Sequence, residues 1–327
     1  MLQEKKNKYL STMFLLQPAK GNHYWYSYAL TLIFVILGYI LFQLPMTAVI
    51  LAKIAGDDNL DISMLSDFEK NPDFSMFGID RNLGLALMII TFLGIWVGLY
   101  LGVKFLHRRP FNTLIASGNN IRWSRIFWGF GLWMILATIY TLGEWLLYPD
   151  RIVIQWDWSR WLPLLLVALF ILPIQTTAEE LLFRGYLLQS ISYISRRPWV
   201  GILLSSVLFG AIHGMNPEIS HYGVVPMQLY YIGAGLFLAL LTVVDDGLEL
   251  AIGVHAATNI YGAVISSYEK GVIQTDSIFI TTDLNPWAAN FGFFVAAILF
   301  FWIAKKTLKW KTSKDLSYPE TKNEYDE

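Results

Sequence analysis

The chain has 327 residues, of which 55% are hydrophobic and 15% are charged, and its mean hydropathy is +0.46. Soluble domains carry about 25% charged residues, so this composition indicates a membrane protein. The formal net charge of −1, with Lys and Arg scattered among the gaps between apolar runs, excludes a nucleic-acid-binding protein. The sequence contains no cysteine, which excludes disulfides, thiolate metal ligands and a cysteine nucleophile.

Stretches of roughly 20 apolar residues predict eight membrane-spanning helices. The fifth stretch is short, and polar residues interrupt the fourth and the seventh. The predicted fold class is therefore all-α: a polytopic integral membrane protein whose functional site lies inside the helical bundle. The eight predicted spans cover about residues 25–54, 83–106, 126–148, 162–188, 200–212, 226–244, 248–266 and 287–303.

The distribution of basic residues predicts the orientation of these spans. The N-terminal segment (1–24), the second and fourth gaps and the C-terminal tail (304–327) are rich in Lys and Arg, whereas the first gap is acidic. Basic segments stay in the cytoplasm, so both termini are predicted to be cytoplasmic, which requires an even number of spans. We expect one transmembrane domain over residues 25–303, with extramembrane loops at about 55–82 and 267–286. Tryptophans near the span ends support these boundaries: Trp25, Trp123, Trp145, Trp161, Trp199 and Trp287.

Glu179 and Glu180 lie directly after the apolar run of the fourth span. A charged side chain at the centre of a bilayer helix costs roughly 2.5 to 3.5 kcal/mol, so an intramembrane acid predicts a functional site. Helix residues four apart share a face, whereas neighbours point about 100° apart. We therefore expect Glu180 to pair with Arg184 and Glu179 to remain free for acid or base chemistry. A purely structural network of these three charges explains the motif equally well.

Two histidines follow in the fifth and seventh spans. Phe209 precedes His213 by one helical turn, and Asn259 follows His255 by one turn, so each pair shares a helix face. Histidine and asparagine also link membrane helices without any chemistry, which is the alternative for each motif taken alone. Together with Glu179, however, these side chains supply a carboxylate, two imidazoles and an amide. Such a set activates water and stabilises a tetrahedral intermediate, which indicates a hydrolase.

The three motifs resemble the CAAX proteases and bacteriocin-processing enzymes (the CPBP or Abi family), intramembrane endopeptidases whose eukaryotic members cleave prenylated proteins. The family pattern Glu-Glu-x-x-x-Arg, Phe-x-x-x-His and His-x-x-x-Asn is matched in order within about residues 160–266, the expected catalytic core. The resemblance implies that Glu179 and His213 activate the attacking water. It also implies that His255 and Asn259 form the oxyanion site. Three further residues are expected to support them: Glu180, Arg184 and Phe209.

The sequence is compatible with more than one hypothesis for the cofactor and for the functional class of the protein. Two histidines and a glutamate are an adequate zinc set, so a divalent metal would be bound by Glu179, His213 and His255. The paired acids and the amide equally suit a mechanism that requires no cofactor, which is our preferred hypothesis. The expected partners are membrane lipids and a membrane-associated protein or peptide substrate, of lipidated CAAX type or related to bacteriocins. The alternatives are a non-catalytic protein of the same fold, acting in bacteriocin immunity or as a scaffold, and an ion-coupled transporter.

Overall fold

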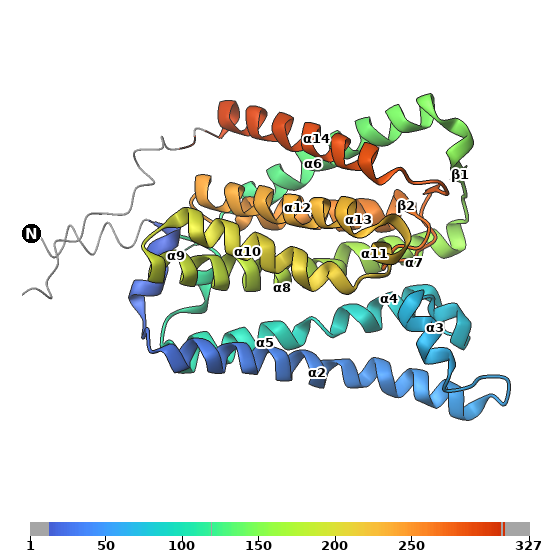
Figure 1. Cartoon of the computed structure of the whole chain (residues 1–327), viewed down its shortest axis with the longest axis horizontal. Helices are drawn as coiled ribbons and strands as arrows, with labels where there is room; N and C mark the ends of the chain where they lie inside the picture. The colour runs from blue at the N-terminus through green and yellow to red at the C-terminus, as the bar shows by residue number, and fades with distance from the viewer. Residues whose placement is uncertain (1–12, 119, 309, 311–327) are drawn as a thin grey trace, which may run out of the picture.

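The computed structural model describes residues 13–118, 120–308 and 310, and the helices within them run mostly along one common axis (Figure 1). The expectations for residues 1–12 and 311–327 lie outside the described residues. Within the described ranges, seven helical segments are long and apolar enough to cross a membrane, which confirms the predicted all-α polytopic membrane protein. These segments are Trp25–Gly56, Arg81–Leu106, Trp123–Leu147, Trp158–Ser195, Pro198–Met215, Val224–Val244 and Pro286–Thr307.

The first two spans form a closely packed pair. After a 3₁₀ helix, η1 (Phe14–Lys20), α2 (Trp25–Gly56) crosses the bundle, and α4 (Arg81–Ile90), α5 (Leu93–Leu101) and a π-helix, η3 (Gly102–Leu106), return beside it. Gly38 faces Gly94 so closely that a Cβ on Gly94 would lie 2.1 Å from the Gly38 carbonyl oxygen. Small residues permit this approach of two membrane helices. The first loop holds α3 (Met64–Lys70) and η2 (Phe74–Phe77), and η4 (Phe111–Leu114) precedes the third span, α6 (Trp123–Leu147).

The fourth span is interrupted twice, and the second interruption carries the acid pair. Its 38 residues would measure about 57 Å as one straight helix, far more than a hydrocarbon core of about 30 Å. The chain forms α7 (Trp158–Phe170), α8 (Leu172–Glu180), a π-helix, η6 (Leu181–Leu188), and α9 (Gln189–Ser195). The first break falls at Ile171, two residues before Pro173, which lacks the amide hydrogen that a continuous helix needs. The second begins directly after Glu180, and π-turns within helices are frequent at functional sites.

The predicted seventh span forms α13 (Glu249–Val264), which differs from the seven long segments. It has 16 residues, about 24 Å of helix, and 13 of them are buried. It packs tightly on α6, where a Cβ on Gly253 would lie 2.1 Å from a carbonyl oxygen of that helix. Because neighbouring helices, rather than lipid, surround α13, polar side chains on it are tolerated. Its other neighbours are α7, α8 and α12 (Val224–Val244). The remaining helices are α10 (Pro198–Ile212) and α14 (Pro286–Thr307), and η7 (His213–Met215) and α11 (Pro217–Tyr222) connect α10 to α12.

The first and last described residues meet at one end of the bundle. The backbone N–H of Phe14 donates to Asp246 Oδ1 at 2.7 Å, and the indole N–H of Trp310 donates to Asp245 Oδ1 at 2.9 Å. The turn between α12 and α13 therefore binds residues near both ends of the described chain. This arrangement agrees with the expected even number of passes, with α13 as the eighth, whereas the cytoplasmic location of that end stays a prediction.

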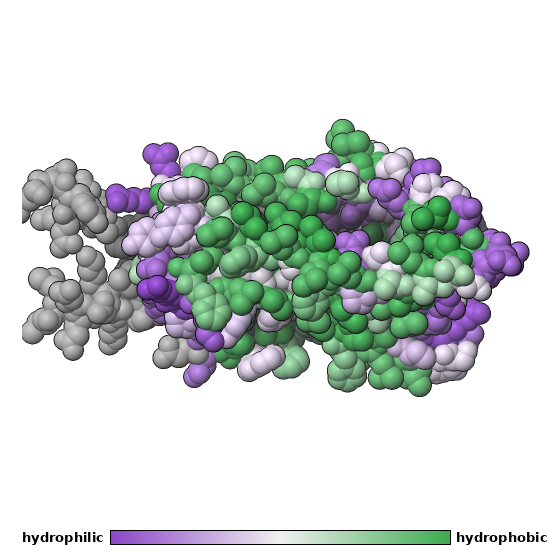
Figure 2. Space-filling view, turned by 90° about the horizontal axis from the view of Figure 1, so that it is seen from below, coloured by the Kyte–Doolittle hydropathy of each residue, from purple (hydrophilic) through white to green (hydrophobic). Residues whose placement is uncertain are grey.

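Exposed aromatic residues mark the two ends of the apolar band. Figure 2 shows one face of the molecule, on which hydrophobic residues cover the middle and hydrophilic residues gather toward both ends. Trp25, Trp123 and Trp199 lie at or next to the first residue of α2, α6 and α10, and Trp287 lies near the start of α14; all are exposed. These are the depths that amphipathic rings favour. Trp161 instead turns inward and donates to a backbone carbonyl of α13 at 3.0 Å.

A small sheet covers the end of the bundle opposite the described chain ends (Figure 1). A short 3₁₀ turn, η5 (Pro149–Arg151), leads into β1 (Ile152–Ile154), while β2 (Ser266–Tyr268) and β3 (Phe279–Thr281) come from the last extramembrane loop. The strand order is β1-β3-β2, with β3 antiparallel to β1 and parallel to β2.

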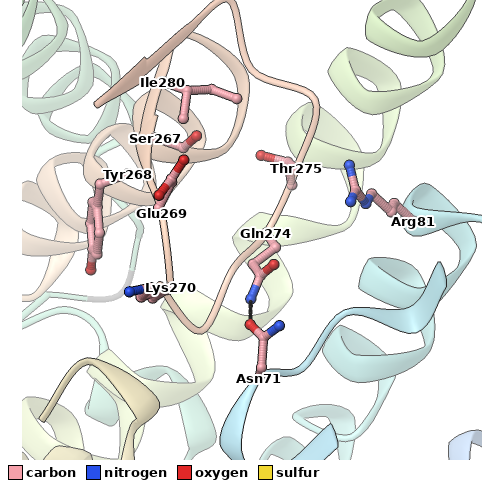
Figure 3. A pocket seen from close by; sticks show the side chains of 9 residues that line it. All are labelled: Asn71, Arg81, Ser267, Tyr268, Glu269, Lys270, Gln274, Thr275 and Ile280. Atoms are coloured by element: carbon pink, nitrogen blue, oxygen red, sulfur yellow. Dashed lines mark hydrogen bonds between the residues drawn. The ribbon is translucent and has the colours of Figure 1, made fainter. Parts of the chain in front are cut away.

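A polar cavity of about 300 Å³ separates this sheet from the first loop (Figure 3). Arg81 bridges the two loops because its guanidinium binds Asp73 at 2.9 Å and Asp276 at 3.0 Å. Gln274 also donates a hydrogen bond to Asn71. These contacts join loops that are about 200 residues apart in the chain into one cap.

Candidate active site

The acid pair lies where α8 passes into η6, and both carboxylates are buried. Glu180 is fully buried, and its Oε1 accepts hydrogen bonds from Arg184 Nη1 at 2.8 Å and from His255 Nδ1 at 2.7 Å. The pairing of Glu180 with Arg184 that the four-residue spacing predicts is therefore present. The link from Glu180 to His255, across 75 residues, was not anticipated. Two donors on one carboxylate oxygen hold the charge of Glu180 in place.

His255 contacts both acids at once. Its Nδ1 donates to Glu180, and its Nε2 lies 3.7 Å from Glu179 Oε2. The two acids diverge by about 100° around their helix, but the two nitrogens lie on different edges of the imidazole ring, so one histidine reaches both. The 3.7 Å separation is longer than a direct hydrogen bond and suits a bridging water. On its other side, Glu179 Oε1 accepts from Gln175 Nε2 at 3.3 Å.

His213 lies at the end of α10, and its protonation pattern follows from its partners. Its Nδ1 lies 2.7 Å from the Phe209 carbonyl oxygen, an acceptor only, so Nδ1 is the donor. In the neutral ring, Nε2 is then a free acceptor. Tyr231 of α12 stacks on the imidazole with the ring centroids 4.5 Å apart and the planes inclined by 26°. The Tyr231 hydroxyl is itself held by Asn216, which donates to it at 3.1 Å.

Phe209 is the apolar centre of the site. Its ring centroid lies 4.3 Å from the guanidinium carbon of Arg184, 4.4 Å from the His213 ring and 6.2 Å from the His255 ring. The edge of its ring packs against Phe183 at 5.2 Å. A cation above an aromatic face is attracted by the ring quadrupole. Phe209 thus joins the helices that carry the two histidines and excludes water from the buried arginine.

The remaining predicted site residue, Asn259, lies one turn after His255 on α13 and is partly buried. Its side chain makes no hydrogen bond with the residues that the structure describes. The zinc set of Glu179, His213 and His255 stays a prediction. No contact joins His213 to Glu179, and in the described part of the chain no three His, Asp or Glu side chains are grouped to hold a metal ion.

Two further residues of the site escaped the sequence reasoning. Gln175 precedes Glu179 by four residues, a spacing that allows an amide to pair with an acid on one helix face, so a local signal was available. Tyr231 comes from another helix, and nothing in its own segment distinguishes it from the other aromatic residues there.

The charges in the site are not fully matched. Among the described residues, Arg184 forms an ion pair with Glu180, whereas Glu179 approaches only the His255 imidazole at ion-pair distance. Glu180 Oε2 and Arg184 Nε are buried and have no hydrogen-bond partner among the described residues. Buried polar atoms without partners are rare in folded proteins and recur where function requires them. The arrangement can hold and move a proton beside a polarised water or carbonyl.

Comparison with known proteins connects this geometry to a family. The family model described as type II CAAX prenyl endopeptidase, Rce1-like, matches residues 158–261, which contain all three motifs. The uncharacterized protein YyaK of Bacillus subtilis (strain 168) is 30% identical over 304 residues, a match that covers 89% of this chain and 96% of that protein. No solved structure matches.

Proposed function

The chain belongs to the Rce1-like family of type II CAAX prenyl endopeptidases, and on that basis we propose that it hydrolyses a peptide bond of a membrane-associated substrate with Glu179 as the general base. The observation that carries the proposal is the buried contact of His255 with both acids, at 2.7 Å and 3.7 Å. A matched structural network would leave neither acid free. Here Glu180 is engaged by Arg184 and His255, whereas the polar contacts of Glu179 within the described residues are one amide and one imidazole.

In the proposed reaction, the Glu179 carboxylate takes a proton from a water molecule, and the resulting hydroxide adds to the carbonyl carbon of the substrate. His213 accepts a hydrogen bond from the same water through its free Nε2. The oxyanion accepts hydrogen bonds from His255 Nε2 and from the Asn259 amide. Glu179 then gives its proton to the amide nitrogen as the C–N bond breaks, which yields a carboxylic acid and an amine.

Glu180 acts on this reaction through His255. By accepting the Nδ1 hydrogen, its carboxylate orients the imidazole and stabilises the protonated ring, as a buried aspartate does in a serine protease triad. Protonated His255 is a stronger donor to a developing oxyanion. Arg184 offsets the charge that Glu180 brings into the bundle.

The substrate that we propose carries a lipid chain or a strongly apolar segment. A second cavity, of about 240 Å³, is lined mainly by apolar and aromatic side chains of α6, α12, α13 and α14. Thr258 and Tyr261 of α13, which flank Asn259 in sequence, form part of its wall. An apolar cavity on the helix that carries His255 and Asn259 supports a substrate that is anchored in the membrane, of the lipidated CAAX type, over a freely soluble peptide.

The test is Glu179→Ala in the full chain, expressed in membranes. We expect the cleavage products found with the unaltered protein to disappear from a comparison of membrane-proteome termini, while the variant inserts in equal amount. The matched control is Glu69→Ala, which removes an exposed acid of α3 and should change neither quantity. A Glu179→Ala variant that yields the same products would rule out Glu179 as the base.

A further inference from the structure

Arg109 is a buried arginine that forms no ion pair with an acid among the residues that the structure describes. The residue comes shortly after η3, at the end of the bundle where the first and last described residues meet, and it is only 4% exposed. Its Nη1 donates to the Gln189 side-chain oxygen at 3.0 Å. Within the described residues this is the only hydrogen bond of a group with five N–H donors, and no described carboxylate lies within 4 Å. A buried guanidinium that lacks a negative partner is costly, so a ligand that supplies one would be strongly favoured.

The backbone around Arg109 is tightly built. Arg108 adopts a left-handed conformation with φ of 54°, and His107 Nδ1 donates to the Asn22 carbonyl oxygen at 2.9 Å. A Cβ on Gly21 would lie 2.3 Å from the His107 carbonyl oxygen and 3.1 Å from Arg109 Cβ. The segment before α2 is therefore pressed against the turn that carries Arg109, so the position of the guanidinium is set by packing.

The ionisable neighbours of Arg109 are also basic. Lys20 and His23 are exposed residues near Arg109, and partial burial together with repulsion from Arg109 lowers the pKa of each. Burial lowers the pKa of Arg109 itself to about 10. Tyr28 and Tyr186 complete the surroundings as neutral hydroxyl groups. The charged groups here are thus the buried guanidinium and the Lys20 ammonium, while the lowered pKa of His23 leaves its imidazole neutral near pH 7.

The depth of this cluster coincides with the membrane surface. Directly after His23, the side chains of Tyr24, Trp25 and Tyr26 are 56%, 80% and 44% exposed. Exposed tyrosine and tryptophan at the start of a span lie at the level of the lipid headgroups, where phosphate groups are concentrated. We propose that Arg109, together with the neighbouring Lys20 and His23, binds a phosphate-bearing anion: the headgroup phosphate of an anionic phospholipid, or a free phosphate ion.

The experiment measures binding to the purified full-length protein in neutral detergent. Native mass spectrometry would quantify retained phosphatidylglycerol against phosphatidylcholine, and thermal unfolding would be followed with and without inorganic phosphate. We expect Arg109→Gln to weaken binding of the anion by at least about tenfold. Arg108→Gln, which removes the exposed neighbouring charge, is the control and should keep most of the binding.

The experiment distinguishes a lipid headgroup from a free phosphate ion as the source of the anion. Preferential retention of phosphatidylglycerol that depends on Arg109 assigns the lipid, whereas stabilisation by inorganic phosphate alone that depends on Arg109 assigns the free ion. If Arg109→Gln fails to fold, the variant Lys20→Gln tests the neighbouring cation instead, with about fivefold weaker binding expected for the charge removed. Binding of both anions that is unchanged in either variant would overturn the proposal.

Discussion

Two groups of charges on α13 differ in how completely positive and negative charges are paired. The terminal cluster lies around Glu249 at the start of the helix, and the central cluster lies around His255. In the terminal cluster, Arg122 binds Glu249 through both carboxylate oxygens, at 3.1 Å and 2.6 Å, and approaches Asp245 at 3.1 Å. Arg125 Nε lies 3.4 Å from the same aspartate. Two arginines thus face two acids, and the pairing is bidentate, the geometry in which guanidinium binds carboxylate most strongly.

The central cluster around His255 is built differently. Glu179 and Glu180 face a single Arg184, and the imidazole reaches both acids. The difference teaches which buried acids are structural and which are available for chemistry. Where every charge has a fixed opposite, proton transfer would break a stable pair, whereas Glu179 has no guanidinium within ion-pair distance among the described residues and contacts an imidazole instead.

The largest effect on stability is expected for Glu180→Gln. The change leaves Arg184, which is fully buried, without its counter-charge, and breaking a buried pair from one side costs about 3 to 5 kcal/mol. Folded yield and activity should both fall. The double variant Glu180→Gln, Arg184→Met should recover much of the stability in a thermal unfolding assay, without recovering activity. Normal unfolding of the single variant would show that the pair is dispensable.

Glu249→Gln tests the terminal cluster in the same way. Arg122 keeps Asp245 as a partner and is about one third exposed, so we expect a smaller loss, about 2 to 3 kcal/mol. Activity per folded molecule should be unchanged, because this cluster is not in contact with the site. A fall in that specific activity, measured in matched amounts of folded protein, would erase the distinction between the two clusters.

A smaller effect is expected at Tyr231, which belongs to the central cluster only through its stacking on His213. Tyr231→Leu removes a ring contact worth about 0.5 to 1.5 kcal/mol, so the rate should drop by at most about tenfold, with a shifted pH profile. Tyr231→Phe keeps the ring and should restore the profile. If the two variants behave alike, the stacked ring does not position the imidazole.

The smallest effect extends the comparison to a solvated ion pair in the first loop. The Arg81 guanidinium lowers the pKa of Asp73 to about 2, below its unfolded value of about 3.9. The resulting stabilisation is present above the unfolded pKa and is lost as the pH falls through the folded one, between about pH 4 and pH 2. Asp73→Asn should remove this pH dependence of the free energy of unfolding. Asp67→Asn, which alters an exposed pair with Lys70, should leave it unchanged.

Much of the helical layout was predictable because apolar runs report directly on membrane spans. The spans, the kink near Pro173 and the pairing of Glu180 with Arg184 all follow from spacing along one segment. The short, enclosed α13 was harder, since an apolar run has the same composition whether lipid or protein surrounds it. The π-turn after Glu180 leaves no distinct mark in the sequence either, because it depends on how η6 packs against its neighbours.

By itself, the sequence determined the membrane class and the residue types of the site, because hydropathy and helical spacing are local properties of the chain. Only the tertiary structure decided that His255 meets both acids, that Tyr231 stacks on His213 and that Arg109 is buried with no described acid beside it. Each of these depends on the rotation and depth of one helix against another. Close contacts of small residues, such as Gly253 against α6, set those rotations, and they join segments that are distant in the sequence.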